Sequence, residues 1–182
     1  ITVEELMHFV KGPDFPTGGI IQGRQGIKDA FETGRGRIVI RSKTEIEVND
    51  SGRETIVVTE IPYMVNKREM IEKIAELVET KKVEGIAYIN DETTMKGVRV
   101  VIRLKKDANA NVVLNMLYKY SPLQSSFSVN NVALVNGRPR TLNLKQLIKY
   151  FVRHRHEVIL RRTRFDLEKA RKRAHILEGL LK

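Results

Sequence analysis

The alternation of apolar and polar residues predicts several β-strands. Residues 37–48 alternate with a period of two, which is typical of a strand with one buried face. The apolar positions of this run are Ile38, Ile40, Ile46 and Val48. The turn at residues 49–52 joins it to a second β-rich run at residues 54–61, so the two are predicted to form a hairpin. Further strands are predicted at residues 83–90, 98–104 and 126–135, the last closed by a turn at 136–139.

Apolar residues spaced three and four apart predict helices between these strands. Thr2 with Glu5, and Asn66 with Glu69, have the spacing of a capping box at a helix N-terminus. Gly34 is placed to end a short helix at residues 26–33. The predicted inner faces are Leu6, Phe9 and Val10 in residues 2–10; Ile27, Ala30 and Phe31; Met70, Ile71, Ile74, Leu77 and Val78; and Val112, Val113, Met116 and Leu117 in residues 109–120.

The order of elements predicts an α+β fold, with a mostly antiparallel sheet and helices packed on one face. From residue 143 the pattern changes, because Leu144, Phe151, Val158 and Phe165 are separated by seven residues. A helix of about forty residues would span roughly 60 Å and project beyond a compact body. Its apolar stripe would need a partner segment or subunit. We therefore predict an α+β domain at residues 1–140 and a long helix at residues 141–182.

The charge of the chain points to a polyanionic partner. Its 182 residues contain 33 Lys and Arg against 22 Asp and Glu, a net charge of +11, and the pI is about 9.9. Nucleic acid, an acidic membrane and an acidic protein all fit this balance. The lack of cysteine excludes disulfides, cysteine–zinc sites and thiol catalysis. No apolar run approaches the roughly 18 residues of a membrane span, so we expect no membrane partner.

Glycines and cations are concentrated in residues 12–37, which read GPDFPTGGIIQGRQGIKDAFETGRGR. Gly18 and Gly23 have the gap of a phosphate-binding P-loop, but Arg24-Gln25 follows where Lys-Ser/Thr would stand, so a nucleotide cradle is disfavoured. Two interpretations stay open. The glycines could serve tight turns, or they could let the backbone lie against a nucleic acid whose phosphates meet the cations. The cations concerned are Arg24, Lys28, Arg35 and Arg37, followed by Arg41 and Lys43 on the next strand.

The chain offers no catalytic nucleophile that the sequence supports. His154 and His156 are two residues apart and diverge around a helix, so they cannot share a metal ion. No Ser-His-Asp arrangement has a supporting motif. Residues 153–173 are strongly basic and could form either a solvated helix face at an interface or a surface for acidic groups of a partner. Because the chain begins without Met and stops within a helical pattern, we expect it to be a fragment of a longer protein.

The chain resembles the A subunits of bacterial type IIA topoisomerases along its whole length. The resemblance is carried by GPDFPTGGIIQGRQGI, TGRGRIVIRSKTEIE and VVTEIPYMVNKREMIEKIAELV. The last part, YFVRHRHEVILRRTRFDLEKARKRAHILEGL, is more similar to DNA gyrase A subunits than to topoisomerase IV A subunits. The resemblance implies that residues 1–140 are a tower domain and that residues 141–182 are the first arm of a coiled coil.

The resemblance also implies a function for the parent enzyme. In this family the A subunit dimerises and joins two B subunits, giving an A2B2 tetramer that changes DNA supercoiling in the cytoplasm by ATP-dependent double-strand breakage, strand passage and rejoining. The B subunits hold the ATPase and a Mg²⁺ site, so this chain is expected to bind no cofactor and no metal. The family's cleaving tyrosine stands in an Arg-Tyr-Thr type of motif, which this sequence lacks. We therefore expect the fragment alone to be inactive and to have no catalytic residue.

By the same resemblance, the basic residues of the tower would support double-stranded DNA outside the cut. The candidate DNA-binding residues are Arg24, Lys28, Arg35, Arg37, Arg41 and Lys43. They would contact phosphates without reading bases. The alternatives are a structural module whose basic surface meets the partner subunit, or the equivalent part of the A chain of a topoisomerase IV. The charge also suits a free-standing RNA-binding protein, but the sequence has no RNP-type aromatic motif.

Overall fold

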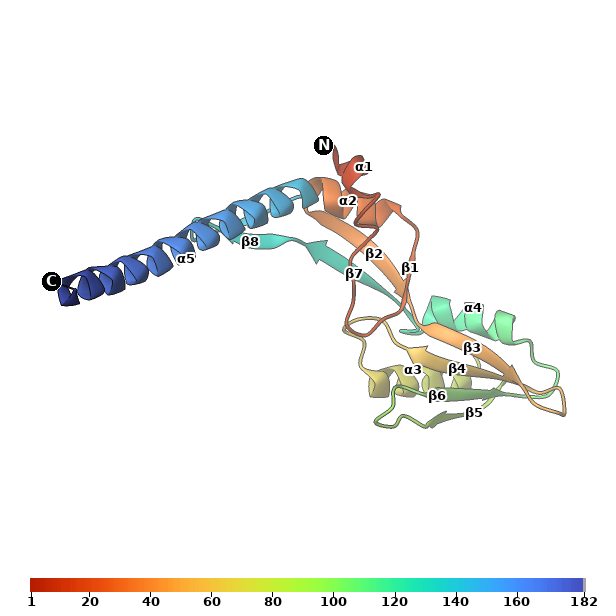
Figure 1. Ribbon diagram of the computed structural model, residues 1–182. Helices are drawn as coiled ribbons and strands as arrows, with labels where there is room; N and C mark the ends of the chain where they lie inside the picture. The colour runs from red at the N-terminus through yellow and green to blue at the C-terminus, as the bar shows by residue number, and fades with distance from the viewer. Residues whose placement is uncertain (182) are drawn as a thin grey trace.

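The computed structural model describes residues 1–181, which form an α+β body and a long helix that projects from it (Figure 1). The helices are α1 (Val3–Leu6), α2 (Gln25–Thr33), α3 (Lys67–Glu79), α4 (Ala110–Tyr120) and α5 (Leu144–Leu180). The strands are β1 (Ile20–Gln22), β2 (Arg35–Arg41), β3 (Lys43–Val48), β4 (Glu54–Glu60), β5 (Ile86–Asp91), β6 (Val100–Leu104), β7 (Gln124–Asn130), β8 (Val132–Val135) and β9 (Arg138–Thr141). The predicted α+β class is confirmed.

The strands form three antiparallel sheets instead of the single sheet that the sequence predicted. Sheet A has the order β1-β2-β7, sheet B has the order β3-β4-β6-β5, and β8 pairs with β9 as a separate hairpin. The predicted strand at residues 37–48 is divided between sheets A and B at Ser42. Ser42 is fully buried, and its amide donates to the carbonyl oxygen of Leu123 at 2.8 Å. This bond to the segment that enters β7 takes Ser42 out of the ladder, so the chain passes from one sheet to the other.

Sheet B has its core on the face covered by α3 and α4. Ile56 of β4 and Ile102 of β6 are paired in register and fully buried. They pack with Met70 and Ile74 of α3 and Leu117 of α4. The cap predicted at Asn66 is confirmed, because its side chain accepts two backbone amides at the N-terminus of α3. Asn109, which was not predicted as a cap, does the same at the N-terminus of α4.

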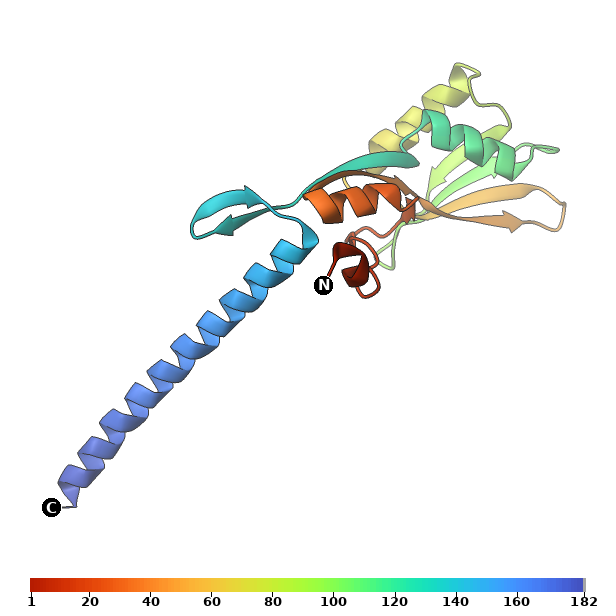
Figure 2. The same ribbon diagram turned by 90° about the horizontal axis from the view of Figure 1, so that it is seen from above.

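Sheet A has a smaller core under α1, α2 and the first turn of α5. Ile27 and Phe31 of α2 pack on Ile38 and Ile40 of β2, and Leu144 closes the cluster from α5. The predicted helix end at Gly34 is confirmed, because Gly34 is the C-cap of α2 with a φ of 81°. Figure 2 shows α2 lying along β2 with α1 beside it, so both helices cover the same side of the sheet.

Two predicted helix faces were partly wrong. The helix expected at residues 2–10 ends at Leu6, and Phe9 is 87% exposed, although Thr2 and Glu5 form the predicted capping box. In α4, Val112 is 61% exposed and Leu114 is buried instead. An apolar residue at a border of a helical stripe can lie on either side, and tertiary packing decides which.

The long helix is confirmed as an element that leaves the body. Asn143 and Gln146 form a capping box at its start, and α5 then runs for 37 residues. Leu144 is its only buried residue within the described chain, and Figures 1 and 2 show the rest extending away from the sheets. None of the helices described within residues 1–181 is both long and apolar enough to cross a membrane.

Candidate nucleic-acid interface

The alternation of β2 places three of the predicted cations on the side of sheet A that the helices leave uncovered. Ile38 and Ile40 face α2, so Arg35, Arg37 and Arg41 face the other way. Their register partners on β7 are small polar residues or amides. We define the open face of sheet A by Arg35, Arg37, Val39 and Arg41 of β2 and Gln124, Ser126, Ser128 and Asn130 of β7, which lie opposite one another in register.

The open face is positively charged without any compensating acid in its strands. Neither β1, β2 nor β7 contains Asp or Glu. Arg35 and Arg37 are exposed, and no side-chain hydrogen bond or ion pair of either is present within residues 1–181. An unpaired guanidinium keeps its donors available for a phosphate oxygen. The two arginines therefore have the chemistry that a phosphate contact needs.

Arg41 is held at the end of this face by contacts within the chain. Its Nε donates to Oε1 of Gln124 at 2.7 Å, and its guanidinium carbon lies 4.5 Å from the ring centroid of Tyr118. Stacking on a tyrosine leaves the outer donors of the guanidinium unused while fixing the plane of the group. The free edge of the Arg41 guanidinium is therefore held in one orientation, in which it could donate to a phosphate oxygen. The same contacts also tie β2 and β7 to α4.

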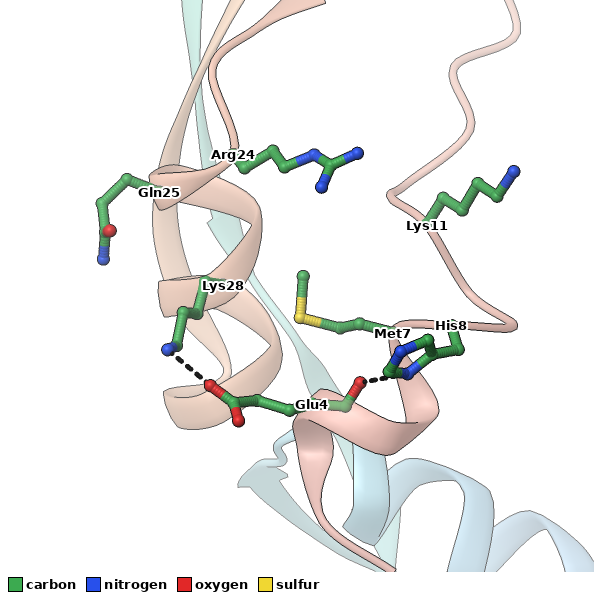
Figure 3. Close-up of a pocket in the computed structure, with 7 residues that line it drawn as sticks. All are labelled: Glu4, Met7, His8, Lys11, Arg24, Gln25 and Lys28. Atoms are coloured by element: carbon green, nitrogen blue, oxygen red, sulfur yellow. Dashed lines mark hydrogen bonds and ion pairs between the residues drawn. The ribbon is translucent and has the colours of Figure 1, made fainter.

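Arg24 and Lys28 lie on the opposite side of sheet A, in a cavity of about 490 Å³ between α1 and α2 (Figure 3). The Nζ atom of Lys28 is 2.8 Å from Oε1 of Glu4 and 3.8 Å from Oε1 of Glu32. The hydrogen bond with Glu4 raises the pKa of Lys28, and the same bond lowers the pKa of Glu4. The charge of Lys28 is thus compensated within the chain.

The cavity is rich in cations. Figure 3 shows Arg24 extending into the space between α2 and the segment that carries Lys11. His8 lines the same cavity, and its Nδ1 lies 3.1 Å from the carbonyl oxygen of Glu4. Since α2 separates this cavity from the open face, one straight duplex lying on the open face would not reach it.

Lys43 belongs to sheet B, beyond the break at Ser42. Its Nζ is 3.7 Å from Oε1 of Glu60, and Oε2 of Glu60 accepts the amide of Gly19 at 2.6 Å. The six predicted residues therefore do not form one cluster. Arg35, Arg37 and Arg41 share the open face, Arg24 and Lys28 share the cavity beside α1, and Lys43 stands apart.

The glycines of residues 12–37 serve the packing of the chain itself. A Cβ atom added to any of them except Gly23 would meet atoms of this chain within 4 Å. At Gly26 it would meet the carbonyl oxygen of Arg37, and at Gly36 that of Gly26. These contacts within the chain disfavour a loop that lies against DNA. They also show that Gly26 and Gly36 serve close packing, which neither interpretation of the sequence had included.

Polar residues of β7 and two arginines of the β8–β9 hairpin were missed by the sequence analysis. The hairpin arginines, Arg138 and Arg140, were assigned to a closing turn or left unassigned, whereas they belong to β9. A signal for them exists, because residues 108–156 contain no Asp or Glu. Within residues 1–181, no three His, Asp or Glu residues are grouped as metal ligands would be.

Comparison with known proteins identifies the family. The model of the DNA gyrase/topoisomerase IV A subunit matches residues 1–182. The chain is 59% identical to the DNA gyrase A subunit of Staphylococcus epidermidis over 181 residues, which is 99% of this chain and 20% of that protein. Its identity to the DNA gyrase A subunit of a Staphylococcus aureus strain is 58% over 181 residues, again 99% of this chain and 20% of that protein. For the DNA gyrase A subunit of Clostridium acetobutylicum it is 55% over 179 residues, 98% of this chain and 22% of that protein.

The match covers nearly all of this chain but only part of each relative. The chain spans about a fifth of the length of these curated relatives. The family model covers the chain from end to end, and the identities are far above the level at which unrelated sequences agree. The chain belongs to the family of DNA gyrase/topoisomerase IV A subunits.

Proposed function

We propose that this chain is a DNA-supporting module of a DNA gyrase A subunit, made of the tower domain and the first arm of a coiled coil. The relatives from the two staphylococci and the clostridium are gyrase A subunits, which supports gyrase over topoisomerase IV. An α+β body with one long, unpartnered helix fits this division.

The parent enzyme is proposed to be an isomerase that changes DNA supercoiling in the cytoplasm through ATP-dependent breakage, passage and rejoining of duplexes. Its partners would be double-stranded DNA, a second A subunit, and two gyrase B subunits, which would supply the ATP and Mg²⁺ sites. This chain would contribute no catalytic residue. Its part would be to hold the duplex beside the cut.

The observation that carries the DNA-supporting role is the open face of sheet A. It presents Arg35 and Arg37 beside Ser126, Ser128 and Asn130, all exposed and without an acid in the strands. Arginine, serine and asparagine side chains commonly donate to phosphate oxygens, so the residues of this face would contact the backbone of the duplex. Binding there would be independent of sequence and sensitive to salt.

The test is the affinity of the chain for a fluorescent duplex of about 40 base pairs, measured by anisotropy at several salt concentrations. Each phosphate neutralised adds about 0.9 to the negative slope of log K against log salt. Arg35→Gln with Arg37→Gln should therefore reduce the slope by about 1.8 and weaken binding for all sequences alike. The matched control is Arg53→Gln, because Arg53 is an exposed cation at the distant β3–β4 turn.

An unchanged slope in the double variant would overturn the assignment of DNA to the open face. If the double variant instead kept DNA affinity and lost association with the B subunit, the basic surface would be a subunit interface. The only support for this second candidate, a subunit interface, is the charge balance, because an acidic protein surface would attract the same arginines.

A further inference from the structure

Strands β7 and β8 follow one another along the chain, and Figure 2 shows β8 leading on from the end of β7. Asn131 joins them: its amide donates to the carbonyl oxygen of Gly34, and its carbonyl oxygen accepts the amide of Leu142, both at 2.8 Å. The N–H and C=O of one residue in an antiparallel ladder point to the same side. Gly34, which precedes β2, and Leu142, which follows β9, therefore lie on the same side of Asn131.

The close approach of Gly34 and Leu142 agrees with this arrangement. A Cβ atom added to Gly34 would lie 2.6 Å from the carbonyl oxygen of Leu142. Strands β2 and β9 thus border residues 124–135 from one side. The opposite side of these residues, which we call the β7–β8 edge, has no partner strand within residues 1–181.

The backbone of every second residue points out from the β7–β8 edge. In an antiparallel pair, residues whose N–H and C=O bond to the partner strand alternate with residues whose groups point away. Because Asn131 bonds to Gly34, its neighbours direct these groups away from β2 and β9. The residues with outward groups are Ser126, Ser128, Asn130, Val132 and Leu134. Their donors and acceptors are available to a further strand.

The β7–β8 edge lacks the features that protect the other strand edges of this fold. Residues 124–135 contain no charged residue and no proline. In contrast, β1 has only three residues, β3 carries one lysine and two glutamates, and β5 has a shift in register. Strand β9 carries Pro139 between two arginines. Short length, charge, bulges and proline all hinder the pairing of an edge, so the β7–β8 edge is the one built to accept a strand.

The open face of sheet A indicates which side chains such a strand would carry. The strand would lie about 4.8 Å beyond β7, with side chains alternating between the two faces of the sheet. In register, Arg37 lies opposite Ser128 and Arg35 lies opposite Asn130, and both arginines are exposed. The short side chains of Ser128 and Asn130 leave the arginines uncovered. Long acidic side chains on the added strand would therefore reach both guanidinium groups.

Towards the hairpin the same face becomes apolar. Val132 is 52% exposed and Leu134 is 74% exposed. Leu134 pairs with Pro139 in register, so the neighbouring Arg138 and Arg140 alternate onto the other face and add no charge here. Apolar side chains on the added strand would cover Val132 and Leu134, and the burial of apolar surface favours binding.

We propose that the β7–β8 edge binds an extended peptide of a partner protein as a fourth strand of sheet A. The peptide carries acidic residues on the face beside Ser128 and Asn130, and apolar residues on the same face beside Val132 and Leu134. Main-chain hydrogen bonds supply affinity and the alternate side chains supply specificity. A second copy of residues 124–135 does not fit, because it contains no acid. This inference does not depend on the proposed function, although the acids of the peptide would compete with DNA for Arg35 and Arg37.

The test measures fluorescence anisotropy of a labelled peptide with the 182-residue chain. The probe is Val-Thr-Val-Thr-Glu-Thr-Glu-Thr-Glu-Thr, whose valines and glutamates share one face of a strand. In the antiparallel pairing, the amides of the valines and glutamates bond to the β7–β8 edge and those of the threonines point away. N-methylation of the first set should weaken binding at least tenfold, and N-methylation of the threonines should change it little. Replacing the glutamates by lysines should also weaken binding at least tenfold.

A variant of the chain tests the same edge from the other side. Val132→Pro removes one outward N–H at the first residue of β8, a position where strands tolerate proline. Its matched control is Val132→Ala, which shortens the side chain and keeps the N–H. The proline variant should bind the peptide about three- to tenfold more weakly than the alanine variant, as the loss of one hydrogen bond does. Circular dichroism checks that both variants are folded.

Equal weakening by the two N-methylated peptides would overturn strand addition, as would absence of binding at about 1 mM peptide. Equal binding of the lysine peptide would overturn the acidic partner. If Val132→Pro kept the peptide and reduced self-association in sedimentation velocity, the edge would pair copies of this chain and the proposal would be wrong.

The duplex experiment distinguishes failure of this proposal from failure of the proposed function. Val132→Pro removes no cation, so it should leave the salt slope of DNA binding unchanged. Loss of the peptide contact with DNA binding retained would overturn strand addition alone. An unchanged DNA slope in the Arg35→Gln, Arg37→Gln variant, with the peptide still sensitive to N-methylation of its valines and glutamates, would overturn the proposed function alone.

Discussion

Gly26 of α2 and Gly36 of β2 set the distance between the helix and the strand. A Cβ at Gly36 would lie 2.7 Å from the amide nitrogen of Ala30 and would also meet the carbonyl oxygen of Gly26. Both neighbours are backbone atoms of the packed helix, so they cannot move without shifting α2 as a whole. The close approach in turn places Ile38 and Ile40 under the helix and leaves the arginines of β2 on the open face.

Gly36→Ala is therefore expected to lower the free energy of unfolding by about 2 kcal/mol or more, as overpacking of a core does. Urea unfolding followed by circular dichroism would measure it. Gly179→Ala is the matched control, because Gly179 lies in α5 with nothing near its added Cβ and should lose no stability. Equal stability of Gly36→Ala and the unmodified chain would contradict the close packing.

At the scale of elements, one ion pair ties the start of α3 to the end of β5. The Nζ atom of Lys67 is 2.7 Å from Oδ2 of Asp91, and the amide of Thr93 donates to Oδ1. The hydrogen bond from Lys67 is the main cause that lowers the pKa of Asp91 to about 2. A lowered pKa in the folded state means that the ionised carboxylate stabilises the fold.

The contribution of Asp91 is present above the ordinary pKa of 3.8 and is lost as the pH falls through about 2. Asp91→Asn should lower the free energy of unfolding at pH 7 by on the order of 1 kcal/mol, since the partly exposed pair is screened by solvent. The difference in free energy of unfolding between Asp91→Asn and the unmodified chain should shrink as the pH falls from 3.8 to about 2. Urea titrations across that range would show it, and a difference independent of pH would contradict it.

At the scale of the whole molecule, the long helix decides the shape. The 37 residues of α5 extend for about 55 Å. Phe151, Ile159, Phe165 and Leu177 are exposed along it, so these apolar residues are left uncovered by the rest of residues 1–181. In the proposed function, the second arm of a coiled coil would cover them.

Small-angle X-ray scattering extrapolated to zero concentration should give an elongated particle. A compact chain of this length would have a radius of gyration of about 16 Å, and the projecting helix should raise the value above about 20 Å. The value should rise further with concentration if the exposed stripe drives self-association. A radius near 16 Å would mean that α5 packs back onto the body in solution.

The site was only partly predictable from the sequence. Arg37 and Arg41 were expected on the polar face of a strand, and the structure places them there because side-chain alternation is a local property. Arg35 was expected in the glycine-rich stretch before the strand, whereas β2 begins at Arg35. Arg24 and Lys28 were grouped with them because they are near in sequence. The structure puts them on the other side of sheet A, because α2 packs across β2 and carries them with it.

What the sequence by itself determined is what depends on neighbouring residues: the caps at Thr2 and Asn66, the helix end at Gly34, the β3–β4 hairpin and the family resemblance. Only the tertiary structure decided how the strands divide into sheets. The break at Ser42 depends on a hydrogen bond to Leu123, about eighty residues away along the chain, and no local pattern encodes such a partner. That break separates the open face from Lys43.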